Sequence, residues 1–294
     1  MSPDGVAASA GRARTIFYTL LALCAFATNS ILCRLALGDG SIDPASFTAL
    51  RLFSGTLVLL AILLLRGRRP GGDWLSGLAL FLYAAPFSFA YVSLGVGTGA
   101  LLAFGAVQLT MLVAGIRHGE RPPAAEWCGI LAAVGGLVYL VSPGLRAPSL
   151  AGSALMIVAG VAWGIYSLRG RRVAHPVAAT AGNFLRALPF TLLVSLAFLR
   201  QADISPGGAT LAVVSGALTS GLGYVIWYAA LRGLTATRAA AAQLATPALA
   251  ALGGVLFLGE PITARLVVAG ALILGGVALA LRRRHVAPLR SIHD

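Results

Sequence analysis

Apolar residues follow one another in long runs along this chain, and short polar breaks separate the runs. A run of about 20 apolar residues forms a helix that crosses roughly 30 Å of hydrocarbon, with its backbone hydrogen bonds satisfied inside the helix. Continuous runs, rather than short segments of alternating polarity, favour helices over barrel strands. The pattern predicts an all-α polytopic membrane protein with ten transmembrane helices, at residues 15–37, 44–66, 74–94, 97–116, 124–142, 149–169, 177–199, 208–231, 237–258 and 262–282.

Arginine is distributed unevenly among the loops of this ten-helix arrangement. If the N-terminus is cytoplasmic, sixteen arginines lie on the cytoplasmic side and four on the other. Cytoplasmic loops carry an excess of basic residues, so we expect both termini in the cytoplasm. Merging the third and fourth runs, which only the segment from Gly95 to Gly99 separates, would give nine spans and remove the bias. The charge distribution therefore supports ten spans.

One polar motif occurs twice, as ATNSILCR at 27–34 and as AWGIYSLR at 162–169. Three pairs of polar residues are 135 positions apart: Arg34 and Arg169, Arg51 and Arg186, and Gln108 and Gln243. Each half has five spans, and because five is odd, the second half enters the membrane from the opposite side. Inverted repeats of this kind are typical of transporters. We expect five-helix repeats at 15–142 and 149–282, between a cytoplasmic tail at 1–14 and a basic cytoplasmic tail at 283–294.

Composition excludes a soluble domain. The chain is 58% hydrophobic and 11% charged, with a mean hydropathy of +0.88, whereas soluble domains carry about 25% charge. The net charge of +13 comes entirely from arginine, but these residues are scattered over short loops, which does not suggest a nucleic-acid surface. Cys24, Cys33 and Cys128 have no metal-binding spacing and are expected to be packing residues. We expect no cofactor, no metal and no nucleic-acid partner, and a monomer suffices.

The nine acidic residues and four histidines all lie in loops, tails or at the ends of the runs. Proton-coupled pumps commonly use an intramembrane carboxylate or histidine as a relay, so proton coupling of that kind is not expected here. The same distribution leaves no paired carboxylates and no mid-membrane base for an intramembrane enzyme.

Uncharged polar and aromatic residues near the middle of the spans are the candidates for a substrate cavity. They are Asn29, Ser30, Tyr83, Ser88, Phe104, Gln108, Trp163, Tyr166, Tyr224, Gln243 and Thr246. Aromatic rings can stack on a ligand, and amides can bind both an ammonium and a carboxylate group. For the two glutamines, hydrogen bonding between helices is an equally good interpretation.

Arg51 and Arg186 are the two charges that lie well inside a span. An arginine at the middle of a membrane helix costs about 2.5–3.5 kcal/mol on insertion scales. One interpretation is that both side chains snorkel to the nearest interface; the other is a gate contact or a charge that binds a carboxylate. Pro86, Pro189 and Pro247 interrupt three spans and are candidate hinges or static kinks.

The two five-span halves, the motif ending at Arg34 or Arg169 and the Gly-Glu-Pro at 259–261 resemble the drug/metabolite transporter superfamily, EamA type. The resemblance covers roughly 14–284. The first-half counterpart of Gly-Glu-Pro is altered to Gly-Glu-Arg-Pro at 119–122, and Thr28-Asn29 occupies the position of Trp163-Gly164. The aromatic-rich centre looks most similar to YddG-type aromatic amino-acid exporters of bacterial inner membranes. That resemblance implies export of aromatic and some other amino acids through a cavity between the halves.

Several functions fit these features. The first is an inner-membrane exporter of amino acids, or of similar small metabolites, that works by alternating access. The second is an exporter of lipophilic cations attracted by aromatic faces; the lack of a mid-membrane carboxylate counts against it. A nucleotide-sugar or sugar-phosphate carrier would be expected to have more basic residues in its cavity. From another class, a channel or a structural membrane subunit is not excluded by the repeat alone.

Overall fold

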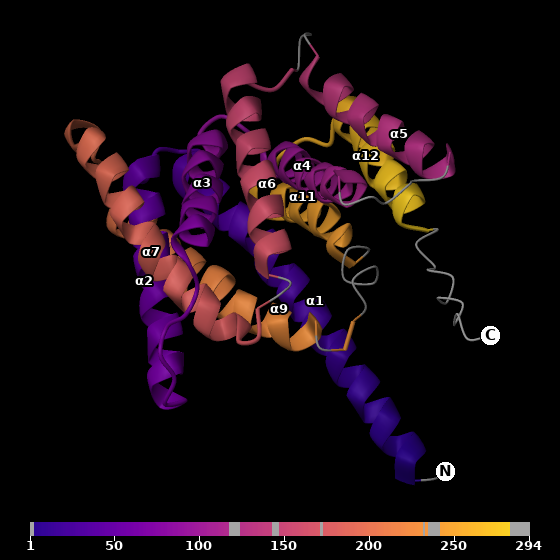
Figure 1. The fold of residues 1–294 in the computed structure, drawn as a ribbon. Coiled ribbons are helices and arrows are strands. Elements are labelled where there is room, and N and C mark those ends of the chain that lie inside the picture. The colour runs from indigo at the N-terminus through magenta and orange to yellow at the C-terminus, as the bar shows by residue number, and fades with distance from the viewer. Residues whose placement is uncertain are drawn as a thin grey trace.

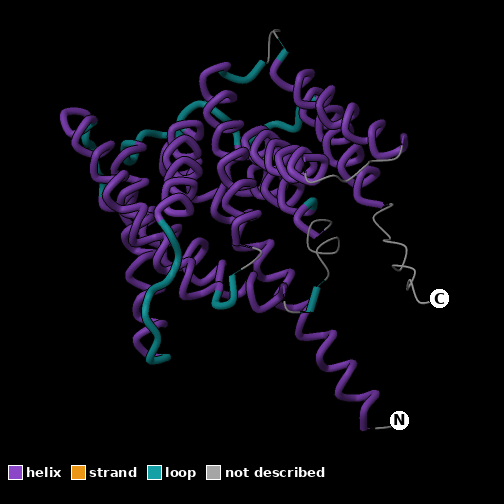
Figure 2. Tube along the Cα trace, viewed as in Figure 1, coloured by secondary structure: helices purple, strands orange, loops and turns teal. Residues whose placement is uncertain are grey.

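The computed structural model describes residues 3–117, 124–142, 147–170, 173–231, 233–234 and 242–282. Its helices pack side by side (Figures 1 and 2), and among these residues the one extended pairing is an isolated bridge between Ile42 and Ile204. The helices are α1 (Pro3–Leu37), α2 (Pro44–Leu65), α3 (Trp74–Tyr91), α4 (Val96–Arg117), α5 (Ala124–Val141), α6 (Leu150–Gly170), α7 (Pro176–Ala197), α8 (Pro206–Val214), α9 (Gly223–Leu231), α11 (Ala245–Leu258) and α12 (Ala264–Arg282). The expected all-α class is confirmed.

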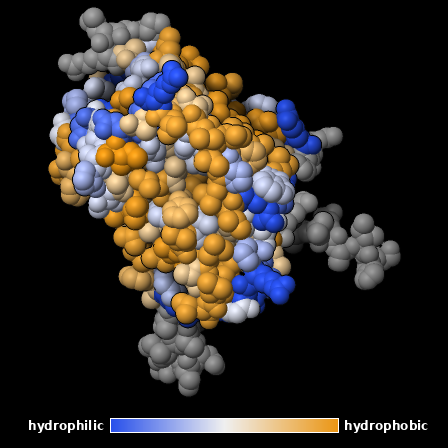
Figure 3. Space-filling view, turned by 90° about the vertical axis from the view of Figure 1, so that its left-hand side faces the viewer, coloured by the Kyte–Doolittle hydropathy of each residue, from blue (hydrophilic) through white to orange (hydrophobic). Residues whose placement is uncertain are grey.

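In the part of the chain that the structure describes, seven helices are long and apolar enough to cross a membrane, and three shorter apolar helices lie at Trp127–Val141, Ala245–Leu258 and Ala264–Leu279. Leucines and other large apolar side chains remain exposed on many of them. Figure 3 shows one face of the molecule covered largely by hydrophobic side chains, with hydrophilic patches toward its margins. An apolar surface of this extent needs lipid around it, because soluble monomers rarely expose large contiguous apolar patches.

The helix limits agree with the sequence pattern to within a few residues for most spans, and three differences are informative. Helix α1 begins at Pro3, inside the segment expected to be a tail, where alanines favour helix. The span at 206–231 is continuous but widens into a π-helical segment at Ser215–Leu222. Finally, α11 begins at Ala245, and residues 237–241 of the expected ninth span lie outside the described residues.

The three prolines have different positions in their helices. Pro86 and Pro189 lie inside α3 and α7, where a proline removes one backbone hydrogen bond and bends the helix. Pro247 is in the first turn of α11, where its missing N–H would have no intrahelical partner in any case. Pro247 therefore accompanies the start of a helix rather than a kink within one.

Helices from the two halves of the chain pack against one another in exchanged pairs: the first helix of each half packs on helices of the other half. Helix α6 packs on α3 and α4, and α1 packs correspondingly on α9 and α11. Helices α2 and α7 contact each other, as do α5 and α12, which form a separate pair at one side of the bundle (Figure 1). The buried core is therefore built largely between the halves rather than within each of them.

Glycine allows α5 and α12 to approach closely. A Cβ atom at Gly136 would lie 2.8 Å from Cβ of Leu272, and one at Gly276 would lie 2.5 Å from the carbonyl oxygen of Gly129. The adjacent Gly135 and Gly275 have no such neighbour within 4 Å. One glycine of each Gly-Gly pair thus lies in the helix contact, and the other does not.

We expect Gly136→Val to lower the thermal stability of the detergent-solubilised protein by several degrees. The added side chain must displace Leu272 or Ile273, and overpacking of this kind costs about 1–3 kcal/mol. Gly135→Val is the matched control, because it adds the same β-branched residue to the same helix without that contact. Fluorescence-detected melting would measure both variants; equal losses would show that α5 and α12 do not pack as described.

Candidate functional site

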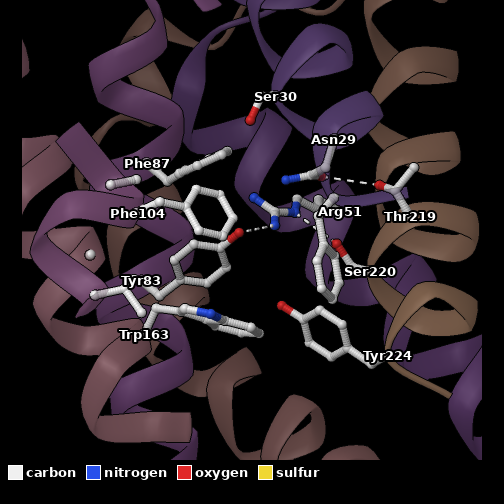
Figure 4. Close-up of a pocket in the computed structure, with 14 residues that line it drawn as sticks. Asn29, Ser30, Arg51, Tyr83, Phe87, Phe104, Trp163, Thr219, Ser220 and Tyr224 are labelled. Atoms are coloured by element: carbon white, nitrogen blue, oxygen red, sulfur yellow. Dashed lines mark hydrogen bonds between the residues drawn. The ribbon is translucent and has the colours of Figure 1, made fainter. Parts of the chain in front are cut away.

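A small chamber lies between the two halves, where α1, α2, α3, α4, α6, the π-helical segment and the start of α9 meet (Figure 4). It is lined by Phe26, Asn29, Ser30, Arg51, Tyr83, Phe87, Ala103, Phe104, Val107, Gly160, Trp163, Thr219, Ser220 and Tyr224. The volume open to the centre of a water molecule is about 30 Å³, which is room for about two waters. A larger ligand therefore requires the lining side chains to move.

Arg51 is the charged residue of this chamber. Its side chain is 1% exposed, with Nε donating to Ser220 Oγ at 3.1 Å and Nη2 donating to Tyr83 Oη at 3.2 Å. The guanidinium carbon lies 5.3 Å from the ring centroids of both Tyr83 and Phe87, within the range of a cation–π contact. Arg51 therefore does not snorkel to the interface but points into the chamber.

A close approach between α2 and the π-helical segment places Ser220 beside Arg51. A Cβ atom at Gly216 would collide with Ser54 Oγ and with the carbonyl of Arg51, so only glycine fits there. Widened helical turns of this type are frequent at functional sites. The same segment orients Asn29, whose Oδ1 accepts hydrogen bonds from Ser215 Oγ at 2.7 Å and from Thr219 Oγ1 at 3.1 Å.

An aromatic layer separates the chamber from a much larger vestibule. Trp163 packs on Tyr83 and Tyr224, with ring centroids 4.8 Å and 5.1 Å apart, and Trp163 and Tyr224 line both cavities. The vestibule measures about 710 Å³, and its wall includes Tyr166, Tyr228 and Gln243. Trp163 and Tyr224 therefore form part of the boundary between the two spaces.

Beyond the chamber, about one helix turn further along α1 from Ser30, a clamp holds the α3–α4 turn. We call the helix ends near Arg34 and Glu260 the Arg34 face, and the opposite ends, near Arg169, the Arg169 face. Arg34 Nη1 donates to the last carbonyls of α3, at Tyr91 and Val92, both at 3.0 Å. Glu260 accepts from the N–H of Val96 at 2.8 Å and lies 3.7 Å from Arg34. A cation at a helix C-terminus and a carboxylate at a helix N-terminus are both favourable.

The Gly-Glu-Pro motif builds this clamp. Gly259 ends α11 with a φ of 64°, a left-handed conformation that favours glycine. The N–H of Glu260 then returns to the carbonyl of Gly254, and its carboxylate is directed at α4. The altered counterpart at 119–122 lies outside the described residues. On the same face, Asp203 N–H donates to Asp43 Oδ2 and Asp43 N–H donates to the carbonyl of Asp203, so the loops before α2 and α8 are joined.

The Arg169 face has a different set of contacts, beside the open vestibule. Arg169 donates to Asp73 Oδ1 at 2.8 Å and to Ser76 Oγ at 2.9 Å. Burial opposes ionisation of Asp73, but hydrogen bonds from Ser76 and Arg169 outweigh it and hold the pKa of this carboxyl below its usual value. This contact therefore persists at neutral pH and is lost only as the pH falls through that lowered pKa.

Arg186, the partner of Arg51 at the offset of 135, is not in the chamber. Its Nη1 donates to the carbonyls of Gly71 and Gly182, at 2.6 Å and 3.0 Å. Asn183 from the same helix accepts from the N–H of Asp73 at 3.1 Å. Arg186, in the middle of α7, thus ties the loop before α3 to α7, which is a structural role.

The structure divides the eleven cavity candidates into three groups. Asn29, Ser30, Tyr83, Phe104, Trp163 and Tyr224 line the chamber, and Tyr166 and Gln243 line the vestibule. Ser88, Gln108 and Thr246 are buried but do not line either cavity. Ser88 donates to the carbonyl of Ala84 in its own helix. Whether any of these residues binds a substrate stays a prediction.

The sequence patterns did not single out several chamber residues. Phe26 precedes Asn29 and Ser30 by three and four positions, and Phe87 follows Tyr83 by four, so helical spacing could have identified both. Thr219 and Ser220 lie in a run of small residues that resembles a packing surface. Nothing in the local sequence signals the π-helical segment that turns them toward Arg51.

The EamA-like transporter family matches this chain twice, at residues 13–142 and 150–282. An uncharacterised protein of Pseudomonas aeruginosa is 54% identical over 92% of this chain and 96% of its own. The threonine/homoserine exporter RhtA of Escherichia coli K12 is 29% identical over 85% of this chain and 86% of its own. A solved crystal structure with 25% identity gives a TM-score of 0.66 and covers 94% of this chain and 100% of that one.

We expect Glu260→Gln to open the Arg34 face. The amide cannot form the ion pair with Arg34, and losing a half-buried ion pair of this kind costs on the order of 1 kcal/mol, roughly a fivefold change in population. Cys33, which is buried next to this clamp, would react several times faster with a hydrophilic maleimide in a Cys24→Ser/Cys128→Ser background. Asp39→Asn is the control, because Asp39 hydrogen-bonds to Ser41 in its own loop and Arg34 is only the weakest of its electrostatic neighbours. Equal rates in both variants would contradict the clamp.

We expect Arg186→Gln to lower thermal stability without changing the chamber. The substitution removes two charge-assisted hydrogen bonds to carbonyls, each worth about 1.5–3 kcal/mol, and so loosens the loop before α3. Fluorescence-detected melting measures the loss. Arg200→Gln, at an exposed position in the turn after α7, is the control and should melt like the native protein. A native melting temperature for Arg186→Gln would show that the loop does not depend on this side chain.

Proposed function

The chain belongs to the EamA-like transporter family, and on that premise we propose that it exports amino acids or similar small metabolites by alternating access across a bacterial inner membrane. The observation that carries this proposal is the unequal closure of the chamber. An ion-paired clamp seals it toward the Arg34 face, and only aromatic side chains separate it from the vestibule. A carrier with a central site alternately opens to either side of such a site.

The charge distribution supports assigning the Arg169 face to the cytoplasm. The positive-inside bias places sixteen arginines on that side, and the vestibule includes Arg66. The structure then corresponds to a state that receives cargo from the cytoplasm, as an exporter requires. The exchanged helix pairs support the inverted relationship between the halves. In an inverted pair, equivalent residues of the other half could form a corresponding contact on the other face.

Amino acids are the favoured cargo, for two reasons. The first is that RhtA, the relative in Escherichia coli, is named a threonine/homoserine exporter. The second is that the chamber offers hydroxyls, an amide and a guanidinium to the polar groups of an amino acid. Its aromatic walls support the expected preference for aromatic amino acids. Export of lipophilic cations is disfavoured, because the charge of Arg51 would repel a cation from the chamber.

The chamber offers no support for proton coupling through a carboxylate. Of the described residues that line it, none is Asp, Glu or His. Facilitated export or exchange driven by the amino-acid gradient is therefore the proposed mode. The small free volume implies that loading requires Trp163 and Tyr224 to move away from the chamber.

Counterflow into proteoliposomes tests this function. We expect uptake of labelled phenylalanine or threonine to be stimulated by unlabelled amino acid inside the vesicles and to saturate with concentration. Trp163→Ala should raise the half-saturating concentration by roughly 2–10-fold, the usual worth of an aromatic contact. Trp74→Ala is the control, since Trp74 is exposed at the start of α3. Failure of every proteinogenic amino acid to stimulate uptake would refute amino-acid export, and flux without saturation or counterflow would indicate a channel.

A further inference from the structure

The guanidinium of Arg51 has one unused hydrogen-bonding position inside the chamber. Nη1 is buried and has no hydrogen-bond partner among the described residues, whereas Nε and Nη2 are bound to Ser220 and Tyr83. In Figure 4 the guanidinium group lies in the middle of the chamber. A buried charged donor that remains unpaired reduces stability, so its retention requires an explanation.

The protein does not supply a counter-ion at this position. The described residues that line the chamber contribute hydroxyls, one amide and aromatic rings, but no carboxylate. Two half-buried arginines, Arg34 and Arg186, differ in this respect. Arg34 contacts Glu260 and two carbonyls, and Arg186 contacts two carbonyls. Arg51 alone among these three is left with an open position facing a cavity.

The rings around Arg51 hold the guanidinium without neutralising it. Tyr83 and Phe87 each lie 5.3 Å from its central carbon, and a cation–π contact stabilises the charge while leaving its N–H groups available. Arginine binds carboxylates with charge-assisted hydrogen bonds, which are the strongest that a side chain can offer. The unfilled position therefore matches a carboxylate supplied by a ligand.

The chamber is much less well prepared for an ammonium group. Asn29 Oδ1 already accepts two hydrogen bonds, from Ser215 and Thr219, and no anionic side chain faces the cavity among the described residues. Hydroxyl oxygens and ring faces remain, and the charge of Arg51 opposes a second cation at short range. An ammonium group is tolerated only where it accompanies a carboxylate that neutralises Arg51.

We propose that Nη1 of Arg51 binds the carboxylate of the cargo and that the α-ammonium group is dispensable. The chamber then takes organic monocarboxylates, whether plain anions or amino acids, and rejects amines that lack a carboxylate. This role of Arg51 rests on the proposed transport function, because it names the chemical group by which the same site selects its cargo.

Two matched sets of ligands test this role. One consists of phenylalanine, 3-phenylpropionate and phenylalaninamide, and the other of threonine, 3-hydroxybutyrate and threoninamide. Binding is followed by the fluorescence of Trp163 in a Trp74→Phe/Trp127→Phe/Trp227→Phe variant, since Trp163 borders the chamber. In at least one set, we expect the amino acid and the plain carboxylate to bind at least about tenfold more tightly than the amide.

Variants at position 51 provide the second arm. Arg51→Gln should reduce the tenfold discrimination to less than about twofold, and Arg51→Lys, which keeps the charge, should preserve part of it. Arg186→Gln, compared at a temperature where all variants are folded, is the control and should retain the full discrimination. If Arg51→Gln does not fold, the comparison of the six ligands in the protein that keeps Arg51 still decides the question.

Several outcomes would overturn this role of Arg51: equal binding of amides and carboxylates, binding by none of the six compounds, or unchanged discrimination in Arg51→Gln. Counterflow separates this result from the fate of the proposed function. Amino-acid counterflow combined with equal binding of the amides would remove the role of Arg51 and leave the exporter. Arg51-dependent binding of plain carboxylates without any amino-acid counterflow would keep the role of Arg51 and remove amino-acid export.

Discussion

Arg51 keeps a positive charge inside an apolar helix bundle, and much of the surrounding structure serves to hold it there. Ser220 and Tyr83 accept hydrogen bonds from it, and Tyr83 and Phe87 face its charge. Ser220 reaches Arg51 because the span at 206–231 widens into a π-helical segment and because Gly216 has no side chain. A charge in this position is costly to bury, which makes the chamber around it the most specific feature of the molecule.

The closure of the chamber depends on how helix ends are capped. Arg34 occupies the carbonyl end of α3, and Glu260 occupies the N–H end of α4. Both side chains interact favourably with the helix termini that they cap, and these two interactions stabilise the clamp. The counterpart of Arg34, Arg169, instead binds Asp73 beside the vestibule. Equivalent residues of the two halves thus have different partners, on the closed side and beside the open side respectively.

The aromatic layer connects binding to access. Trp163 and Tyr224 belong to the walls of both cavities, so any movement that enlarges the chamber also changes its separation from the vestibule. The ring of Trp163 packs on Tyr224 and on Tyr83, and Tyr83 accepts a hydrogen bond from Arg51. A ligand that binds Arg51 would consequently alter the packing of the residues that separate it from the vestibule. Such coupling is what a carrier requires, because loading has to precede the change of access.

The sequence by itself determined the helical class and most of the helix limits, because runs of apolar residues of membrane-spanning length have few alternative structures. It also identified Asn29, Tyr83, Trp163 and Tyr224, which are polar or aromatic residues in apolar surroundings. It could not separate Arg51 from Arg186, since both occupy equivalent positions in the repeat. Only the tertiary structure decided that Arg51 faces a chamber and that Arg186 holds a loop. The hydrogen-bond partners of each guanidinium come mostly from segments distant in sequence. The π-helical segment, which brings Thr219 and Ser220 into the site, was decided at the same level, by its packing against α1 and α2.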